Sequence, residues 1–270
     1  MIDAALPPGI RGFLLDMDGT LLVGGRPLPG ATELMEAIRR RGASLLVLTN
    51  NSSDRVEAFH DRLLAAGLDI SPKEILSSGE ATSDHLLHRT PHRRILLLGT
   101  PPLEASFEEA GLELAGPGED APAVVVAFDK TLTYARLEHA CHLLQAGADY
   151  FATHPDVTCI TPDGLIPDTG AIIAAIETVT GRTPFVIGKP ERPMIDAALA
   201  RLGTSAAETV LVGDQLDTDM VMAHSSGLFS VLTLTGETSA ARAQAADPPP
   251  DLIINSVADL VPLAASLGQV

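Results

Sequence analysis

The stretch FLLDMDGTLL, Phe13–Leu22, decides how the rest of the chain is interpreted. A run of apolar residues leads directly into Asp16 and Asp18, which are separated by one residue. In an extended backbone, residues i and i+2 point to the same side, so both carboxylates can face one site. At about 5 Å and an effective dielectric of about 20, two such charges repel by roughly 3 kcal/mol. The pattern therefore indicates a cation beside the carboxylates or a chemical role for them.

Similar apolar runs of strand length recur along the chain and alternate with helical patterns. The runs are residues 44–49, 94–99, 123–129, 184–190, 209–214 and 229–236, and the helical patterns include residues 31–41, 54–66, 137–146 and 171–180. Runs this apolar, placed between helices, favour strands that are buried on both faces of a parallel sheet. The alternating order predicts an α/β fold with helices on both sides of the sheet.

Polar residues stand where four of these expected strands end. They are Asp16, Thr49 with Asn50, Lys189 and Asp214. In open parallel sheets, ligands bind beyond the carboxyl ends of the strands. We therefore expect these residues to share one edge of one sheet.

About a hundred residues with their own α/β pattern lie between the second and third of these strand ends. This insertion predicts two domains. The core domain is expected to comprise residues 1–78 and 183–270, and the inserted α/β domain residues 79–182.

Composition limits the kinds of partner. The chain has 270 residues and a net charge of −17, and this charge argues against binding to nucleic acid or to an anionic membrane. A small phosphorylated substrate needs only a local positive centre and stays compatible. We find no signal-peptide pattern and no apolar run of about 18 residues, which predicts a soluble, cytoplasmic protein. Cys141 and Cys159 belong to no metal-binding pattern, and Cys141 is expected in the core.

A second acidic cluster, VGDQLDTDM, contains Asp214, Asp217 and Asp219 directly after an apolar run. A helix N-terminus favours acidic groups, which accounts for one aspartate. Three of them indicate a metal ligand with outer support. Oxygen ligands of this kind suit a hard cation such as Mg²⁺.

Three familiar motifs are excluded. An EF-hand loop beginning at Asp16 needs Gly and Glu where the chain has Leu21 and Pro27. A P-loop that contains Lys189 would need Gly at position 183 and Ser or Thr at position 190, but the chain has Thr183 and Pro190 there. No G-x-S-x-G sequence supports a serine hydrolase.

Lysine is scarce, since the only others are Lys73 and Lys130, so its presence at position 189 among acidic clusters is unusual. The hydroxyl, amides and backbone N–H groups of Thr49, Asn50 and Asn51 form a suitable cradle for phosphate oxygens, although these residues are also ordinary turn formers.

Taken in order, DMDGT, LTNNS, GKP and GDQLDTD resemble the four motifs of the haloacid dehalogenase superfamily of Mg²⁺-dependent phosphohydrolases. The stretch GTLLVGGRPLPGA and the position of the insertion are similar to subclass IIA. This subclass includes 4-nitrophenyl phosphatase and the phosphoglycolate, pyridoxal-phosphate and nucleotide monophosphate phosphatases. The resemblance covers essentially the whole chain and implies a Rossmann-like core with an inserted α/β cap.

The resemblance also implies roles for individual residues. Asp16 would be the nucleophile that forms an aspartyl-phosphate, and Asp18 the general acid and base. Mg²⁺ would be held by the Asp16 carboxylate, the Asp18 backbone carbonyl and Asp214, with Asp219 in support. Thr49 and Lys189, with N–H groups of Asn50 and Asn51, would bind the phosphate oxygens.

Departures from the pattern lie mainly in the insertion. Similar proteins often have T-N-x-D where this chain has Thr153, His154, Pro155 and Asp156, and Gln215 replaces a common basic residue. His154 and Asp168 are candidates for substrate contact, although a lone histidine in a loop is more often structural. A carboxylate at position 168 would disfavour highly anionic substrates.

A phosphomonoesterase acting on small phosphorylated metabolites is therefore the leading hypothesis. The alternatives are a phosphotransferase or phosphomutase, and a non-catalytic protein that binds phosphorylated metabolites. Carbon–halogen hydrolysis is disfavoured because it needs neither Asp18 nor the metal cluster. Similar proteins often associate through their caps, so a homodimer is among the expectations, although the sequence shows no interface.

Overall fold

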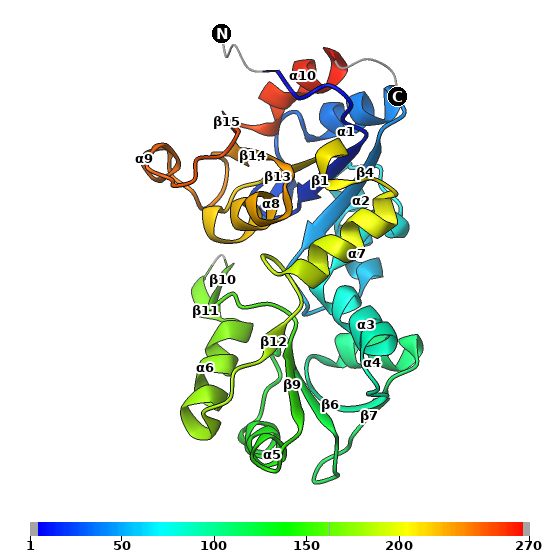
Figure 1. Cartoon of the computed structure of the whole chain (residues 1–270), viewed down its shortest axis with the longest axis vertical. Coiled ribbons are helices and arrows are strands. Elements are labelled where there is room, and N and C mark those ends of the chain that lie inside the picture. The colour runs from blue at the N-terminus through cyan, green and yellow to red at the C-terminus, as the bar shows by residue number, and fades with distance from the viewer. Residues whose placement is uncertain (1–4, 162, 267–270) are drawn as a thin grey trace. The chain divides into compact units, whose positions relative to one another are not determined.

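The computed structural model describes residues 5–161 and 163–266. The chain divides into two compact units (Figure 1). Unit 1 contains the described residues up to Thr49, residues 59–76, and the described residues from Ile195 onward. Unit 2 contains Asn50–Ala58 and Ser77–Met194. Each unit has its own parallel sheet, so the expected α/β architecture is present in both.

The sheet of unit 1 has six strands in the order β15-β14-β13-β1-β4-β5. Their bounds are β1 Gly12–Asp16, β4 Ser44–Thr49, β5 Ile75–Ser77, β13 Thr209–Gly213, β14 Phe229–Thr233 and β15 Leu252–Ile254. β1 is entirely buried and pairs in parallel with both β4 and β13. Since the carboxyl ends of parallel neighbours share one edge, Asp16 lies beside the ends of β4 and β13.

Helices flank this sheet along the chain. They are α1 Ala31–Arg40, α2 Val56–Ala65, α7 Arg192–Leu202, α8 Val221–Ser226, α9 Ala240–Gln244 and α10 Leu260–Ser266. In α1, the apolar residues Leu34, Met35 and Ile38 recur at helical spacing and are buried. Shorter elements are the 3₁₀ turns Pro72–Glu74, Ala206–Glu208 and Val257–Asp259, the π-helical turn Leu216–Met220, and the hairpin of β2 Leu22–Val23 and β3 Arg26–Pro27.

The sheet of unit 2 has five strands in the order β12-β9-β8-β6-β7. Their bounds are β6 Arg94–Leu98, β7 Glu113–Leu114, β8 Ala123–Val126, β9 Asp149–Ala152 and β12 Phe185–Val186. All four pairings between them are parallel. The remaining elements are the helices α3 Ser78–Arg89, α4 Pro101–Ala110, α5 Tyr134–Gln145 and α6 Thr169–Thr180, and the antiparallel hairpin of β10 Thr158–Thr161 and β11 Gly164–Pro167.

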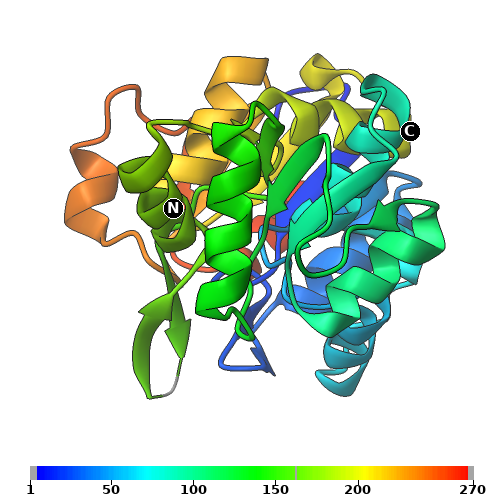
Figure 2. The ribbon, with the colours of Figure 1, turned by 90° about the horizontal axis from the view of Figure 1, so that it is seen from below.

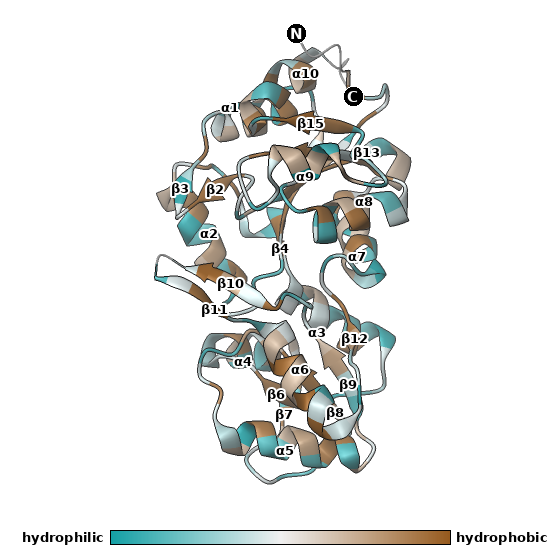
Figure 3. Ribbon diagram, turned by 90° about the vertical axis from the view of Figure 1, so that its left-hand side faces the viewer, coloured by the Kyte–Doolittle hydropathy of each residue, from teal (hydrophilic) through white to brown (hydrophobic). Residues whose placement is uncertain are grey.

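One hydrophobic core of unit 2 lies between its sheet and the helices α5 and α6 (Figure 2). Cys141 belongs to this core, as expected, beside apolar residues of β6 and β8. Burial raises the pKa of the Cys141 thiol, so the thiolate is disfavoured. In Figure 3 the helix α5 carries both hydrophilic and hydrophobic colours along its length, as expected for a helix with one face on a core.

One predicted strand joins a different sheet from the one expected. Residues 184–190 were expected in the sheet of the core domain, but only Phe185–Val186 form a strand, and this strand pairs with β9 of unit 2. The pairing continues beyond the strand, because the Ile187 and Gly188 N–H groups donate to the backbone of Ala152 and Thr153 at 3.0 and 2.8 Å. This segment accordingly belongs to unit 2, which includes Ser77–Met194. The predicted division into a core of residues 1–78 and 183–270 and an inserted domain of residues 79–182 stays a prediction.

The described helices contain none that is both long and apolar enough to cross a membrane.

Candidate active site

Three buried aspartates of unit 1 form a compact group. One carboxylate oxygen of each of Asp16, Asp214 and Asp219 lies within 4.8 Å of the others. Asp16 ends β1 and Asp214 follows the neighbouring strand β13, so the parallel pairing of these strands places the two side by side. The π-helical turn after β13 supplies Asp219. We refer to these three residues as the acid cluster.

Backbone N–H groups fix the orientation of two members. The Glu237 N–H donates to Asp214 Oδ2 at 2.7 Å, and the Gln215 N–H donates to Asp219 Oδ2 at 3.2 Å. The two carboxylates are therefore held in a fixed orientation.

Two glycines leave room for Asp214. A Cβ atom at Gly19, whose φ is 91°, would lie 2.5 Å from Asp214 Oδ2, and one at Gly236 would lie 1.8 Å from the same oxygen. No side chain fits at either distance. A positive φ is also a conformation that only glycine adopts readily. The glycine of the DMDGT stretch is thus required for both its backbone conformation and its close approach to the cluster.

The donor set of the acid cluster fits a divalent cation. At 4.8 Å and an effective dielectric of about 20, each pair of carboxylates repels by roughly 3.5 kcal/mol. Three buried anionic oxygens are the ligands that a hard cation such as Mg²⁺ prefers. A cation among them would convert this repulsion into attraction. Asp219 is therefore also a candidate for direct metal binding, in addition to the supporting role that was expected.

Asp18 lies outside the acid cluster. Its side chain is 54% exposed, and its carboxylate accepts two hydrogen bonds from Arg62 Nη2, at 2.8 and 3.0 Å. Arg62 lies on α2, and nothing in the sequence pointed to it. The Asp18 side chain is thus partly open to solvent and is paired with Arg62.

Two polar segments of unit 2 meet at Asn50 and Lys189. Asn50 Oδ1 accepts a hydrogen bond from the Lys189 N–H at 2.9 Å, and Asn50 Nδ2 donates to the Lys189 carbonyl at 3.0 Å. Both residues are buried, with Lys189 only 3% exposed. These two predicted phosphate-binding residues are therefore brought together, although not by strands of one sheet.

The other two members of the predicted phosphate cradle behave differently. Thr49 ends β4 and is buried in unit 1. Asn51 Oδ1 accepts from both the N–H and the hydroxyl of Ser53, at 2.9 and 2.8 Å, which is a local Asx turn. The side-chain oxygen of Asn51 thus shapes its own loop.

His154 and Asp168 lie in a buried hydrogen-bond network of unit 2. His154 Nε2 is 2.9 Å from Asp168 Oδ1, and His154 Nδ1 is 3.0 Å from Thr153 Oγ1. Asp168 also caps α6 by accepting from the Thr169 N–H at 2.6 Å. His154 is completely buried, so this network gives it a structural role. Contact of either residue with a substrate stays a prediction.

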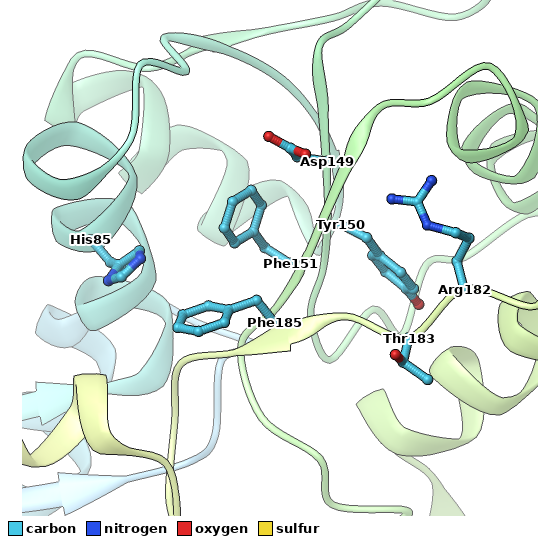
Figure 4. A pocket seen from close by; sticks show the side chains of 7 residues that line it. All are labelled: His85, Asp149, Tyr150, Phe151, Arg182, Thr183 and Phe185. Carbon is cyan, nitrogen blue, oxygen red and sulfur yellow. The ribbon is translucent and has the colours of Figure 1, made fainter.

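Unit 2 also contains a cavity of about 420 Å³ that the sequence did not indicate (Figure 4). His85, Phe151 and Phe185 line one side of it, and the rings of His85 and Phe185 stack with centroids 5.4 Å apart. Burial, and secondarily the charge of Arg89, lowers the pKa of His85. The Arg182 guanidinium at the other side donates to two backbone carbonyls of unit 2. The guanidinium of Arg182 is thus engaged with the protein itself.

Comparisons with known proteins decide the family. Residues 13–113 match the model of a haloacid dehalogenase-like hydrolase family, and residues 186–260 match that of a HAD-hydrolase-like family. The dihydroxyacetone phosphatase of Corynebacterium glutamicum is 34% identical over 92% of this chain and 90% of its own length. The chain belongs to the haloacid dehalogenase superfamily. The 5'-nucleotidase YutF of Bacillus subtilis is a further relative of this superfamily, 31% identical over 84% of this chain and 88% of its own.

Solved structures of the superfamily narrow the assignment. The 4-nitrophenylphosphatase from Thermotoga maritima superposes with a TM-score of 0.89 at 39% identity, covering 94% of this chain and 97% of its own. NagD from E. coli K-12 superposes with a TM-score of 0.86 at 31% identity, covering 93% and 98%. The chain is thus a haloacid dehalogenase phosphatase of subclass IIA, with a Rossmann-like core and an α/β cap. Membership implies a divalent metal and a small phosphorylated substrate.

Proposed function

We propose that this protein is a Mg²⁺-dependent phosphomonoesterase that hydrolyses small phosphorylated metabolites through an aspartyl-phosphate. The observation that carries the proposal is the buried acid cluster, in which one oxygen from each of three carboxylates lies within 4.8 Å of the others. The names of the relatives support the substrate class, since they include a dihydroxyacetone phosphatase, a 5'-nucleotidase and an acid sugar phosphatase. All three names describe enzymes that remove phosphate from small molecules.

The chemistry begins at Asp16. Its carboxylate attacks the phosphorus of the ester, the bond to the leaving oxygen breaks, and the phosphoryl group is transferred to Asp16. Asp18 gives a proton to the leaving oxygen and then takes one from the water that hydrolyses the aspartyl-phosphate. This exchange returns Asp16 to its starting state. The exposure of Asp18 and the burial of Asp16 match these two roles.

Charge around the phosphoryl group is balanced by the surrounding residues. Asp16, Asp214 and Asp219, with the Asp18 carbonyl, would hold Mg²⁺, which neutralises phosphoryl charge when bound. Lys189 contributes a compact positive charge for the phosphate oxygens. Thr49 and the backbone N–H groups of Asn50 and Asn51 complete the proposed cradle. In this proposal unit 1 supplies the reacting carboxylates, and unit 2 corresponds to the cap that selects the substrate. A homodimer and a cytoplasmic location stay predictions.

The test is release of phosphate from para-nitrophenyl phosphate, with and without Mg²⁺. Asp16→Asn keeps the size of the side chain but removes the nucleophile, so we expect turnover and the covalent phosphorylated species, seen by mass spectrometry, to disappear. Asp217→Asn is the matched control, because Asp217 is exposed and pairs with Arg242 at 3.1 Å outside the cluster. Equal rates for Asp16→Asn and wild type would refute the proposed nucleophile. An inactive wild type across a panel of phosphate esters would favour a binding protein.

A further inference from the structure

The amide of Asn50 is paired with the backbone of Lys189 on both sides. Asn50 Oδ1 accepts from the Lys189 N–H at 2.9 Å, while Asn50 Nδ2 donates to the Lys189 carbonyl at 3.0 Å. Nδ2 also donates to Asp156 Oδ2 at 3.0 Å. An asparagine amide has two N–H donors, and here both are engaged within unit 2. The side chain therefore has no donor left for a phosphate oxygen.

Asn50 is itself anchored. The Ser78 hydroxyl, at the start of α3, donates to the Asn50 carbonyl at 2.6 Å. Asn50 is only 8% exposed, so its hydrogen bonds are made where water does not compete freely. Its amide is consequently a fixed reference point in unit 2.

The segment before Lys189 approaches Asn50 closely. A Cβ atom at Gly188 would lie 2.4 Å from the Thr153 carbonyl oxygen and 2.8 Å from Asn50 Oδ1. The Gly188 N–H donates to the same Thr153 carbonyl at 2.8 Å. Glycine is thus required for the backbone to pass between these two oxygens, and the amide of Asn50 then holds the next residue.

We propose that Asn50 is a positioning residue that fixes the backbone of Lys189, and that its effect on phosphate passes through Lys189. This inference rests on the proposed function, in which the Lys189 ammonium binds phosphate oxygens. A lysine side chain is long and flexible, so the protein controls where its charge lies chiefly by fixing the backbone from which it starts. The side chain of Asn50 is accordingly not a phosphate ligand, and only its backbone N–H keeps that assignment.

The backbone part of this proposal is measurable without turnover. The chain has three lysines, so ¹⁵N-lysine labelling gives three backbone amide signals, and Lys189→Arg identifies one of them. In Asn50→Ala we expect the Lys189 amide hydrogen to exchange with solvent at least about tenfold faster, while those of Lys73 and Lys130 are unchanged. Asn255→Ala, at an exposed asparagine of unit 1, is the matched control and leaves all three unchanged. Unchanged exchange of the Lys189 amide in Asn50→Ala would overturn the proposal.

The functional part is a double-mutant cycle in the presence of Mg²⁺. Loss of two hydrogen bonds, each worth about 1 kcal/mol, predicts that Asn50→Ala lowers kcat/KM by roughly thirtyfold. Asn50→Asp, which keeps the size but turns a donor toward the Lys189 carbonyl into an acceptor, should lower it at least as much. If Asn50 acts through Lys189, Asn50→Ala has less than about a twofold effect in the Lys189→Ala background.

The outcomes separate this inference from the proposed function. An undiminished effect of Asn50→Ala in the Lys189→Ala background would show that Asn50 contacts phosphate directly and would overturn the inference. A wild-type protein without phosphatase activity would overturn the proposed function. The amide exchange would still decide whether Asn50 holds the Lys189 backbone.

Discussion

Substitution of Asp219 by asparagine should stabilise the metal-free protein while weakening its response to Mg²⁺. Asp219 is 1% exposed and has a carboxylate oxygen within 4.8 Å of those of Asp16 and Asp214. At an effective dielectric of about 20, its two repulsions sum to roughly 7 kcal/mol. The stored repulsion cannot exceed the cost of protonating one ordinary carboxyl group at pH 7, which is about 4 kcal/mol. This cost is therefore the ceiling on what the substitution can recover.

Part of the stability that Asp219→Asn gains from the removed repulsion is lost through a weaker hydrogen bond. The Gln215 N–H donates to Asp219 Oδ2, and a hydrogen bond to a neutral amide is weaker than one to a carboxylate by about 1 kcal/mol. We therefore expect Asp219→Asn to be more stable than wild type by about 1–3 kcal/mol when metal is removed with EDTA. For a protein of this size the shift in Tm is roughly 3–10 °C. Differential scanning calorimetry in EDTA and in Mg²⁺ measures both states.

Addition of Mg²⁺ should make the wild type more stable than the Asp219→Asn variant. A cation that binds only the folded state raises its stability in proportion to the logarithm of its concentration over its Kd, and the variant has lost one anionic ligand. Asp217→Asn serves as the control, because this exposed aspartate of the same motif pairs with the surface residue Arg242. Its free energy of unfolding should stay within about 0.5 kcal/mol of that of the wild type. The electrostatic reasoning would be refuted if the Asp219→Asn variant were less stable than wild type in EDTA. It would also be refuted if Mg²⁺ raised the Tm of the variant and of the wild type equally.

Two further substitutions test the packing around the site. Gly19→Ala should lower the free energy of unfolding by about 2–4 kcal/mol, because it combines an unfavourable positive φ with a Cβ atom 2.5 Å from Asp214. Gly24→Ala is the control: Gly24 has a φ of 57° but no atom within 4 Å of the added Cβ, so the loss should be only about 1–2 kcal/mol. Similar losses in urea unfolding of both variants would contradict the close approach. Asp168→Ala should lower the free energy of unfolding by about 2–4 kcal/mol, since it removes a helix cap and leaves the buried imidazole of His154 without its carboxylate partner. Thr133→Ala, which removes an exposed helix cap, should lower it by about 1 kcal/mol. Thermal unfolding compares these two, and equal costs would show that the buried network adds nothing.

Two members of the acid cluster, Asp16 and Asp214, could be predicted from the sequence. Each follows an apolar run long enough to be a buried strand, and parallel neighbours bring their carboxyl ends to one edge. Asp16 and Asp214 therefore meet once β1 and β13 pair, which the structure shows. The position of Asp219 relative to the other two could not be predicted, because a π-helical turn after β13 sets it. Helical periodicity does not reveal a single turn of that kind.

The place of Lys189 could not be predicted, because it depends on which sheet receives a two-residue strand. The run PFVIG has the composition of a buried strand and is compatible with either sheet. The structure resolves the choice through the pairing of Phe185 with Phe151 and of Val186 with Ala152, residues that lie far apart in the sequence. Strand pairing at this range is set by packing in three dimensions rather than by local pattern.

The role of the Asn50 side chain was hidden for a related reason. Residue type limits which side chains can attack phosphorus, hold a cation or neutralise an anion, so aspartate and lysine at strand ends are informative on their own. An amide has no such restriction, since its N–H groups and its carbonyl oxygen can bond to backbone groups and its N–H groups also to carboxylate or phosphate oxygens. Its partners are decided by the chain segments that approach it, here residues 156 and 189. The residues proposed to act on the substrate can therefore be predicted from the motifs, whereas the residue proposed to position Lys189 becomes visible only when the backbone contacts are known.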